Sequence, residues 1–164
     1  MLNTAFDDLG AKPGNYVPDQ WLEEIDTVND FVYHRINNGV YKAGFATKQE
    51  VYEEEVTTLF AALDQMEERL AGQDYLVGNR LTEADIRLFT TLVRFDAVYF
   101  GHFKCNLKPL TAYPNLWAYT KRIYQLPGMA QTVNFDHIKR HYYGSHKTIN
   151  PTGVIPLGPI LDWN

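Results

Sequence analysis

The spacing of apolar residues predicts a chain built almost entirely from helices. After Pro18, apolar residues recur every three or four positions up to Ile36, which is the spacing that lines one helix face, and Asn37–Gly39 should end that helix. Thr47 and Glu50 have the spacing of a capping box, which predicts that a second helix begins there. The apolar stripe of this second helix is Val51, Val56, Leu59, Phe60, Leu63, Met66 and Leu70.

A second capping box, from Thr82 to Asp85, precedes the most apolar stretch of the chain. Residues 86–100 carry apolar side chains on nearly all sides, a pattern typical of a helix at the centre of a bundle. Pro114 suits the first turn of a further helix, because the N–H that proline lacks is unpaired there in any case. A last helix is predicted over Phe135–Tyr143. No alternating run bounded by hairpin turns occurs, so we predict an all-α bundle of five or six helices.

The two ends of the chain lack helical periodicity. Residues 1–17 contain Gly10, Pro13 and Gly14, and they are predicted to form an irregular lead-in to the helical domain. Residues 146–164 are rich in proline and glycine and should form an extended tail. The helical domain is therefore expected to occupy residues 18–145.

Composition excludes several classes of partner. The chain has 164 residues, 45% of them apolar, which suffices for one buried core. Its net charge is −5 without a long basic block, so we expect no nucleic acid as partner. No window is apolar enough to span a bilayer, and Asp7 and Asp8 stand where a secretion signal would be basic and then apolar. A single cysteine, Cys105, fits a reducing compartment, so we expect a cytoplasmic protein without a membrane partner.

Two groups of residues suggest chemistry at first sight, but each has a more ordinary interpretation. His137 and His141 share one helix face, as two metal ligands would, yet no acid stands where a third ligand is expected. Histidines bonded to backbone or solvent are the favoured interpretation, and no metal is predicted. Cys105 follows the central helix instead of opening one, so the helix dipole would oppose its thiolate. A partly buried, unreactive thiol is expected.

Tyr41 and Tyr142 stand out among the eleven tyrosines because of their surroundings. Tyr41 lies between Gly39 and Gly44 in what we predict to be a loop, and glycine on both sides would permit close approach of a ligand. Tyr142 ends a short predicted helix just before Gly144. On spacing alone, packed structural rings remain the favoured interpretation of both tyrosines.

Three stretches of the chain resemble the glutathionyl-hydroquinone reductases, the Xi class of the glutathione transferases. They are NNGVYKAGFA at residues 37–46, LTEADIRLFTTLVRFDAVYFGHF at 81–103 and NFDHIKRHYYGSHKTINP at 134–151. The resemblance implies the C-terminal helical domain of such an enzyme, which binds the aromatic substrate and pairs into a homodimer. It also implies an N-terminal thioredoxin-like domain that holds the co-substrate glutathione and the nucleophilic cysteine. Nothing in this chain matches that domain, so the chain alone is expected to be inactive.

The same resemblance makes Tyr41 and Tyr142 the substrate-binding residues of this chain. A phenol can donate a hydrogen bond to a hydroquinone oxygen and assist proton delivery to the ring carbon that loses sulfur. Tyr143 is a weaker candidate, because adjacent residues on a helix point about 100° apart. Two other functions stay open at this point, namely a non-catalytic interaction module and a carrier of apolar aromatic ligands.

Overall fold

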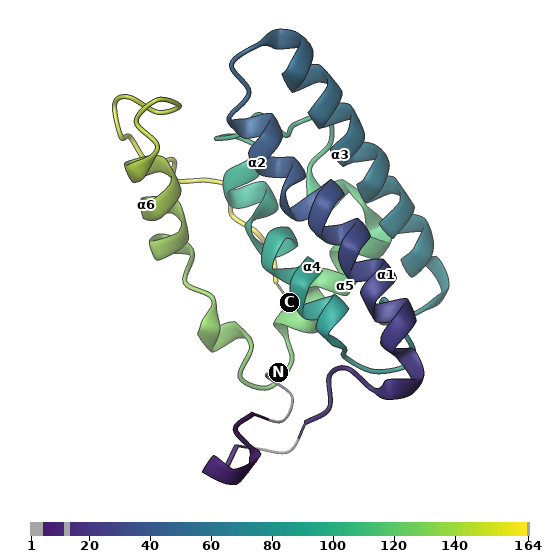
Figure 1. Ribbon diagram of the computed structural model, residues 1–164. Helices are drawn as coiled ribbons and strands as arrows, with labels where there is room; N and C mark the ends of the chain where they lie inside the picture. Colours follow the sequence, from purple (N-terminus) through teal and green to yellow (C-terminus); the bar gives the residue numbers. More distant parts are fainter. Residues whose placement is uncertain (1–4, 12–13, 164) are drawn as a thin grey trace.

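The computed structural model describes residues 5–11 and 14–163. Its α-helices are α1 (Leu22–Val32), α2 (Gly39–Gly44), α3 (Gln49–Arg69), α4 (Glu83–Arg94), α5 (Pro114–Tyr124) and α6 (Phe135–Ser145). No strand occurs within the two described ranges, which confirms the predicted all-α class. Nor is any helix there long and apolar enough to cross a membrane. Figure 1 shows α4 between α6 on one side and the layer of α1, α2 and α3 on the other.

Helix α4 and the turn after it lie at the centre of the bundle, as the all-round apolar pattern predicts. Helix α4 contacts both α1 and α5, and its side chains belong to one continuous apolar cluster. Burial of each large apolar side chain contributes about 1.5–3 kcal/mol, so this segment makes a large contribution to the stability of the bundle. Its buried apolar side chains are Leu88, Phe89, Leu92, Val93, Phe95 and Val98.

The capping box at the start of α4 is present, and its acid also joins neighbouring segments. One carboxylate oxygen of Asp85 accepts hydrogen bonds from the backbone N–H and the hydroxyl of Thr82, at 2.7 and 2.9 Å. The other oxygen accepts from the N–H of Leu76 at 2.8 Å and from the hydroxyl of Tyr119, on α5, at 3.0 Å. The Asp85 side chain is fully buried, so these bonds replace the water that the carboxylate loses on folding.

The capping box predicted at Thr47 is wrong, although a helix does begin nearby. Helix α3 starts at Gln49 with Lys48 at its N-cap, and no side chain caps it. Glu50 consequently occupies the second helical position instead of the third, from which a capping-box acid would reach back to the cap. The local spacing indicated the helix but not the residue at which it begins.

The glycine-flanked loop predicted around Tyr41 is also wrong, because residues 39–44 form helix α2. Its glycines serve close packing: a Cβ atom added to Gly44 would lie 2.7 Å from Cβ of Phe103, and one added to Gly39 would lie 3.4 Å from the side chain of Leu59. The predicted break after Ile36 reduces to a wide helical turn and Asn38, after which the chain is helical again. Tyr41 is therefore held on a rigid element.

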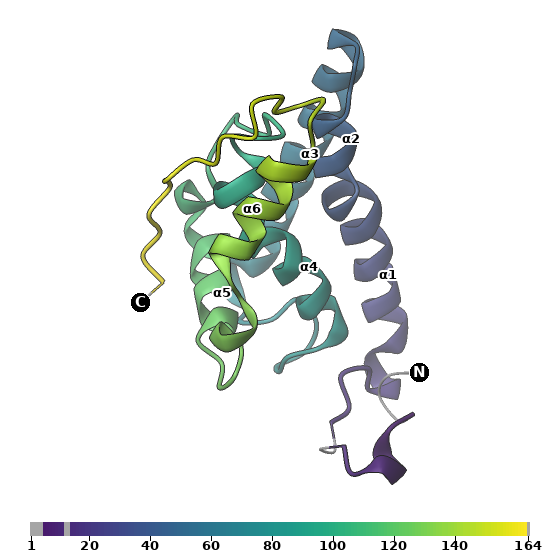
Figure 2. The ribbon, with the colours of Figure 1, turned by 90° about the vertical axis from the view of Figure 1, so that its left-hand side faces the viewer.

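The two ends of the chain differ in how they contact the bundle. Residues 5–11 are exposed and contain one short helical turn, whereas Pro13 lies outside the described residues. The C-terminal segment forms no regular structure beyond residue 153, and it runs along α6 and α5 in Figure 2. The ammonium group of Lys139, on α6, donates hydrogen bonds to three backbone carbonyls of this segment, those of Pro156, Leu157 and Gly158. The ring of Trp163, in the same segment, stacks on Tyr124 of α5. Part of the tail therefore packs on the helical domain.

Candidate functional site

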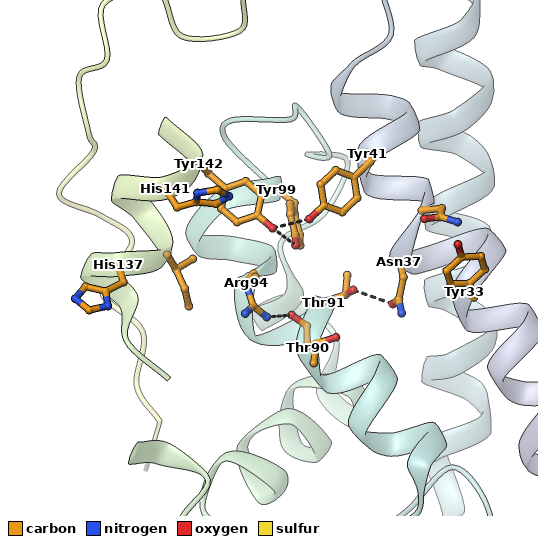
Figure 3. A pocket seen from close by; sticks show the side chains of 12 residues that line it. Tyr33, Asn37, Tyr41, Thr90, Thr91, Arg94, Tyr99, His137, His141 and Tyr142 are labelled. Atoms are coloured by element: carbon orange, nitrogen blue, oxygen red, sulfur yellow. Dashed lines mark hydrogen bonds between the residues drawn. The ribbon is translucent and has the colours of Figure 1, made fainter. Parts of the chain in front are cut away.

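The structure brings Tyr41 and Tyr142 into direct contact. Their hydroxyl oxygens lie 2.6 Å apart, although Tyr41 belongs to α2 and Tyr142 to α6, 101 residues further along the chain. A third hydroxyl, that of Tyr99, lies 3.0 Å from that of Tyr142. Figure 3 shows the three phenols converging from three segments of the bundle. We refer to Tyr41, Tyr99 and Tyr142 as the tyrosine cluster.

Two wide helical turns place these side chains. Helix α4 continues into a π-helical turn over Phe95–Tyr99, in which the N–H of Phe100 donates to the carbonyl of Phe95 at 2.9 Å. Helix α1 continues in the same way over Tyr33–Asn37. Such turns insert one extra residue into the helix and therefore rotate every later side chain about its axis. Neither turn could be predicted, because the apolar spacing continues through both.

Two hydrogen bonds join the wide turn over Tyr33–Asn37 to α4. The amide oxygen of Asn37 accepts from the hydroxyl of Thr91 at 2.8 Å, and its amide nitrogen donates to the carbonyl of Arg87 at 3.3 Å. Asn37, which the sequence suggested only as a helix end, thus fixes the α1–α2 segment against the central helix. This contact sets where Tyr41 lies relative to the rest of the tyrosine cluster.

The tyrosine cluster combines two buried phenols with one accessible phenol. Tyr99 and Tyr142 are 2% and 7% exposed, whereas Tyr41 is 38% exposed. Burial raises the pKa of Tyr142 to about 12, with a further contribution from its bond to Tyr41, and burial likewise raises the pKa of Tyr99 far above its ordinary value. Both buried phenols therefore keep their protons at neutral pH, and the cluster can donate a hydrogen bond into the space beside it.

That space is a cavity of about 590 Å³ between α4 and α6. Its size suits a small aromatic ligand. Polar side chains from α4 and Asn37 line it together with the tyrosine cluster, so a bound ring would contact both polar and aromatic side chains. The lining residues include the whole tyrosine cluster together with Asn37, Arg94, His137 and His141.

His137 and His141 lie on one face of α6, as their spacing predicts, and both line this cavity. In the described part of the chain, no group of three or more His, Cys, Asp or Glu side chains is arranged to hold a metal ion. Asn134 begins this helix by accepting a hydrogen bond from the N–H of His137 at 3.0 Å. The two imidazoles can act as polar contacts for a ligand.

Cys105 does not line the cavity, and it is more deeply buried than the partly buried thiol we expected. Its side chain is fully buried, and its sulfur lies 3.9 Å from the carbonyl oxygen of Val40. Burial raises the pKa of this thiol to about 12, partly offset by the charge of Lys104. A thiol with such a pKa holds almost no thiolate at neutral pH and is a poor nucleophile.

Sequence reasoning missed Tyr99 and Arg94 as residues of the cavity wall. Tyr99 lies within the stretch 81–103 that carries the family resemblance, but its surroundings there are apolar and predict a core ring. Arg94 lies at the end of α4 and is half-buried beside the cavity. Their contacts with residues of α6 depend on how distant segments pack.

Comparison with known proteins finds similarity to the glutathione transferases. Residues 49–122 match the family "Glutathione S-transferase, C-terminal domain". The glutathionyl-hydroquinone reductase YqjG of Escherichia coli is 57% identical over 162 residues, which are 99% of this chain and 49% of that protein. The glutathionyl-hydroquinone reductase PcpF of Sphingobium chlorophenolicum is 57% identical over 97% of this chain and 51% of its own length.

Solved structures of similar proteins have the same fold as this chain. The glutathione-bound structure of YqjG superposes with a TM-score of 0.96, covering 99% of this chain and 53% of that one. The Xi glutathione transferase of Phanerochaete chrysosporium superposes with a TM-score of 0.94 at 51% identity, covering 98% of this chain and 55% of that one. Residues 49–122 thus match a glutathione transferase C-terminal domain, and nearly the whole chain is similar to about half the length of two glutathionyl-hydroquinone reductases and of a Xi-class glutathione transferase.

Proposed function

We propose that this chain is the substrate-binding, C-terminal half of a glutathione-dependent glutathionyl-hydroquinone reductase. The observation that carries the proposal is the 2.6 Å contact between the hydroxyls of Tyr41 and Tyr142 at the wall of a cavity large enough for an aromatic ring. Two relatives with 57% identity bear the name of this activity. Residues 18–145 would form the helical domain, residues 1–17 its lead-in, and residues 146–164 its tail.

The chemistry assigns these tyrosines the role of proton donors to the substrate. In the proposed reaction a thiolate attacks the sulfur of the glutathionyl-hydroquinone, so that a disulfide forms and the bond between sulfur and the ring carbon breaks. The electron pair of that bond remains on the ring carbon, which must take up a proton. Tyr41 is the accessible phenol, and Tyr142 and Tyr99 behind it can resupply its proton through their hydrogen bonds.

The remaining parts of the enzyme would lie outside this chain. A thioredoxin-like domain would supply the nucleophilic cysteine and bind glutathione, which resolves the mixed disulfide and is thereby oxidised. Cys105 cannot take that role, because it is fully buried. We propose that the complete protein is a cytoplasmic homodimer and that this chain alone is inactive.

The test is the turnover of glutathionyl-menadiol by the complete protein with single phenylalanine substitutions. Tyr41→Phe and Tyr142→Phe should each lower kcat by about tenfold to a hundredfold, because each removes one member of the proton-donating chain. Tyr124→Phe is the matched control. Tyr124 lies on α5, outside the cavity, and packs against Trp163 of the C-terminal segment, so this variant should keep full turnover. Circular dichroism of each variant checks that folding is intact.

The outcomes separate the proposal from its alternatives. Unchanged turnover in both cavity variants would contradict the assignment of these tyrosines. Binding of quinones by the complete protein without any turnover would favour a carrier of apolar aromatic ligands. A stable complex with another protein that is insensitive to glutathione conjugates would favour an interaction module.

A further inference from the structure

A second cavity, of about 360 Å³, adjoins the tyrosine-lined one. The two cavities share four lining residues, among them Arg94 and His137, so Arg94 belongs to the wall that they have in common. The rest of the second cavity is mainly apolar and lies between α4 and the segment that leads into α6. Its apolar lining residues are Ile86, Phe89, Val93, Met129, Val133 and Ile138.

Arg94 brings a positive charge to this shared wall without a carboxylate to balance it. Among the described residues, the arginines Arg69, Arg87, Arg122 and Arg140 each pair with an acid, whereas Arg94 pairs with none. The acid nearest to it in sequence, Asp96, has both oxygens engaged by the backbone N–H groups of Leu110 and Thr111, at 2.6 and 3.2 Å. The described lining of the two cavities contains no Asp or Glu side chain.

The guanidinium of Arg94 has donors left for a ligand. It donates to the carbonyl of Thr90, one turn earlier on α4, which holds the side chain in place. A guanidinium carries five N–H donors, so most of them remain available. Arg94 is half-buried, and a partly desolvated cation gains more from an anionic partner than one in water does.

The position of this charge relates it to the tyrosine cluster. Arg94 acts on Tyr142, whose pKa its charge lowers against the larger effect of burial. Arg94 also lines the same cavity as Tyr41, Tyr99 and Tyr142, so a ring that accepts a hydrogen bond from Tyr41 would bring its own substituents or its second oxygen towards the guanidinium. We propose that Arg94 binds an anionic oxygen of the aromatic substrate and so makes the site selective for rings that carry a negative charge.

This inference rests on the proposed function, because it assumes that the tyrosine-lined cavity takes an aromatic ring. The negative oxygen has two possible sources, a carboxylate substituent or an ionised ring hydroxyl. A matched pair of ligands separates them: a dihydroxynaphthoate carries the carboxylate, and dihydroxynaphthalene has the same ring without it. Isothermal titration calorimetry under argon would measure the binding of both to the complete protein and to its Arg94→Gln variant.

We expect the complete protein to bind the naphthoate about tenfold more tightly than the uncharged diol, which is the value of one charge-assisted hydrogen bond. Arg94→Gln should abolish this preference, and Arg94→Lys should retain part of it. Arg140→Gln removes an equal charge from α6 outside both cavities, so it should preserve the preference. If Arg94→Gln instead also weakens binding of the diol, and does so more strongly as the pH rises, the negative oxygen is the ionised ring hydroxyl.

Two results would count against the proposal, and they differ. A preference for the naphthoate that survives in Arg94→Gln, or wild-type affinities that are equal and insensitive to the substitution, would overturn the role of Arg94 alone. Failure of both ligands to bind the complete wild-type protein would overturn the aromatic cavity itself, and with it the proposed function.

Discussion

The Nε2 atom of His102 lies 3.1 Å from the Nδ1 atom of His146. His102 follows Tyr99 by three residues and His146 follows Tyr142 by four, so this bond joins the same two segments as the 3.0 Å contact between Tyr99 and Tyr142. Both imidazoles also stack on the ring of Phe103. A hydrogen bond between two imidazoles needs one donor and one acceptor, so it cannot form when both are protonated.

We therefore predict that the chain loses stability in mild acid. Burial lowers the pKa of His102 to about 4, with smaller contributions from His146 and Lys104, and burial lowers the pKa of His146, with His141 adding to it. In the unfolded chain a histidine takes up its proton near pH 6.5, so the unfolded state binds more protons as the pH falls below about 6.5. For His102 alone, the free energy of unfolding should fall by about 2 kcal/mol between about pH 7.5 and about pH 5.

Urea unfolding at the two pH values, followed by circular dichroism, measures this loss. His102→Gln removes the titrating group, so its free energy of unfolding should depend less on pH than that of the wild type. His34→Gln is the control, because His34 is a largely exposed histidine paired with Asp30 at 3.4 Å on the surface of the bundle. Equal pH dependence in the wild type and His102→Gln would rule out the imidazole pair as the cause.

Local patterns predicted the parts of this fold whose causes are local. The Thr82–Asp85 capping box and the proline at the start of α5 involve residues within one turn, and both are present. The central position of α4 follows from its own apolar residues. Helix α2 was missed because the pattern Gly39–Gly44 suggests a loop, whereas these glycines allow close packing against Leu59 and Phe103 from distant segments.

The candidate site could be predicted only in part for the same reason. Tyr41 and Tyr142 follow from the family resemblance, but their hydrogen bond joins residues 101 positions apart and depends on how α2 and α6 pack. Tyr99 reaches the cluster through a wide turn that apolar spacing does not indicate. The exposed fraction of Arg94 and the lack of an acid beside it are properties of the packed bundle.

Asp85 should contribute far more to stability than the exposed acid Glu83 in the same helical turn. Asp85→Asn replaces an acceptor oxygen of a fully buried carboxylate by an N–H₂ group that faces donors from Thr82, Leu76 or Tyr119. We expect a loss of about 3 kcal/mol in the free energy of unfolding, measured in urea. Glu83→Gln, which breaks the exposed pair with Arg87 in the same first turn, should change it by less than about 1 kcal/mol. Similar losses of unfolding free energy in the two variants would contradict the role of Asp85 in connecting Thr82, Leu76 and Tyr119.

The intact mass of the complete protein in its source cells tests the proposed domain organisation. This chain has a mass of 18.9 kDa and spans 49% of its Escherichia coli relative, so a thioredoxin-like half would bring the mass to about twice that value. Mass spectrometry of the protein, isolated with an antibody against the helical domain, gives the answer. A mass of 18.9 kDa would contradict the enzymatic proposal and favour binding or assembly.

Gly44 links the packing of the bundle to the geometry of the tyrosine cluster. A methyl group at this position would overlap Phe103, whose ring lies 5.4, 5.5 and 5.9 Å from those of Tyr41, Tyr99 and Tyr142. Since α2 and Phe103 cannot both keep their places, Gly44→Ala should cost about 1–3 kcal/mol and also lower the turnover of the complete protein. Urea unfolding and the glutathionyl-menadiol assay measure the two effects.

Gly144→Ala provides the matched control for that substitution. Gly144 lies in α6, two residues beyond Tyr142, and beyond its chain neighbours and the nearby backbone of the helix no described atom stands within 4 Å of an added Cβ. Because alanine favours the helix over glycine, this variant should gain about 0.5–1 kcal/mol in the free energy of unfolding and keep its turnover. If Gly44→Ala proves as harmless as Gly144→Ala, then Phe103 can move without disturbing the cluster, and the phenols are held by their hydrogen bonds instead of by ring packing.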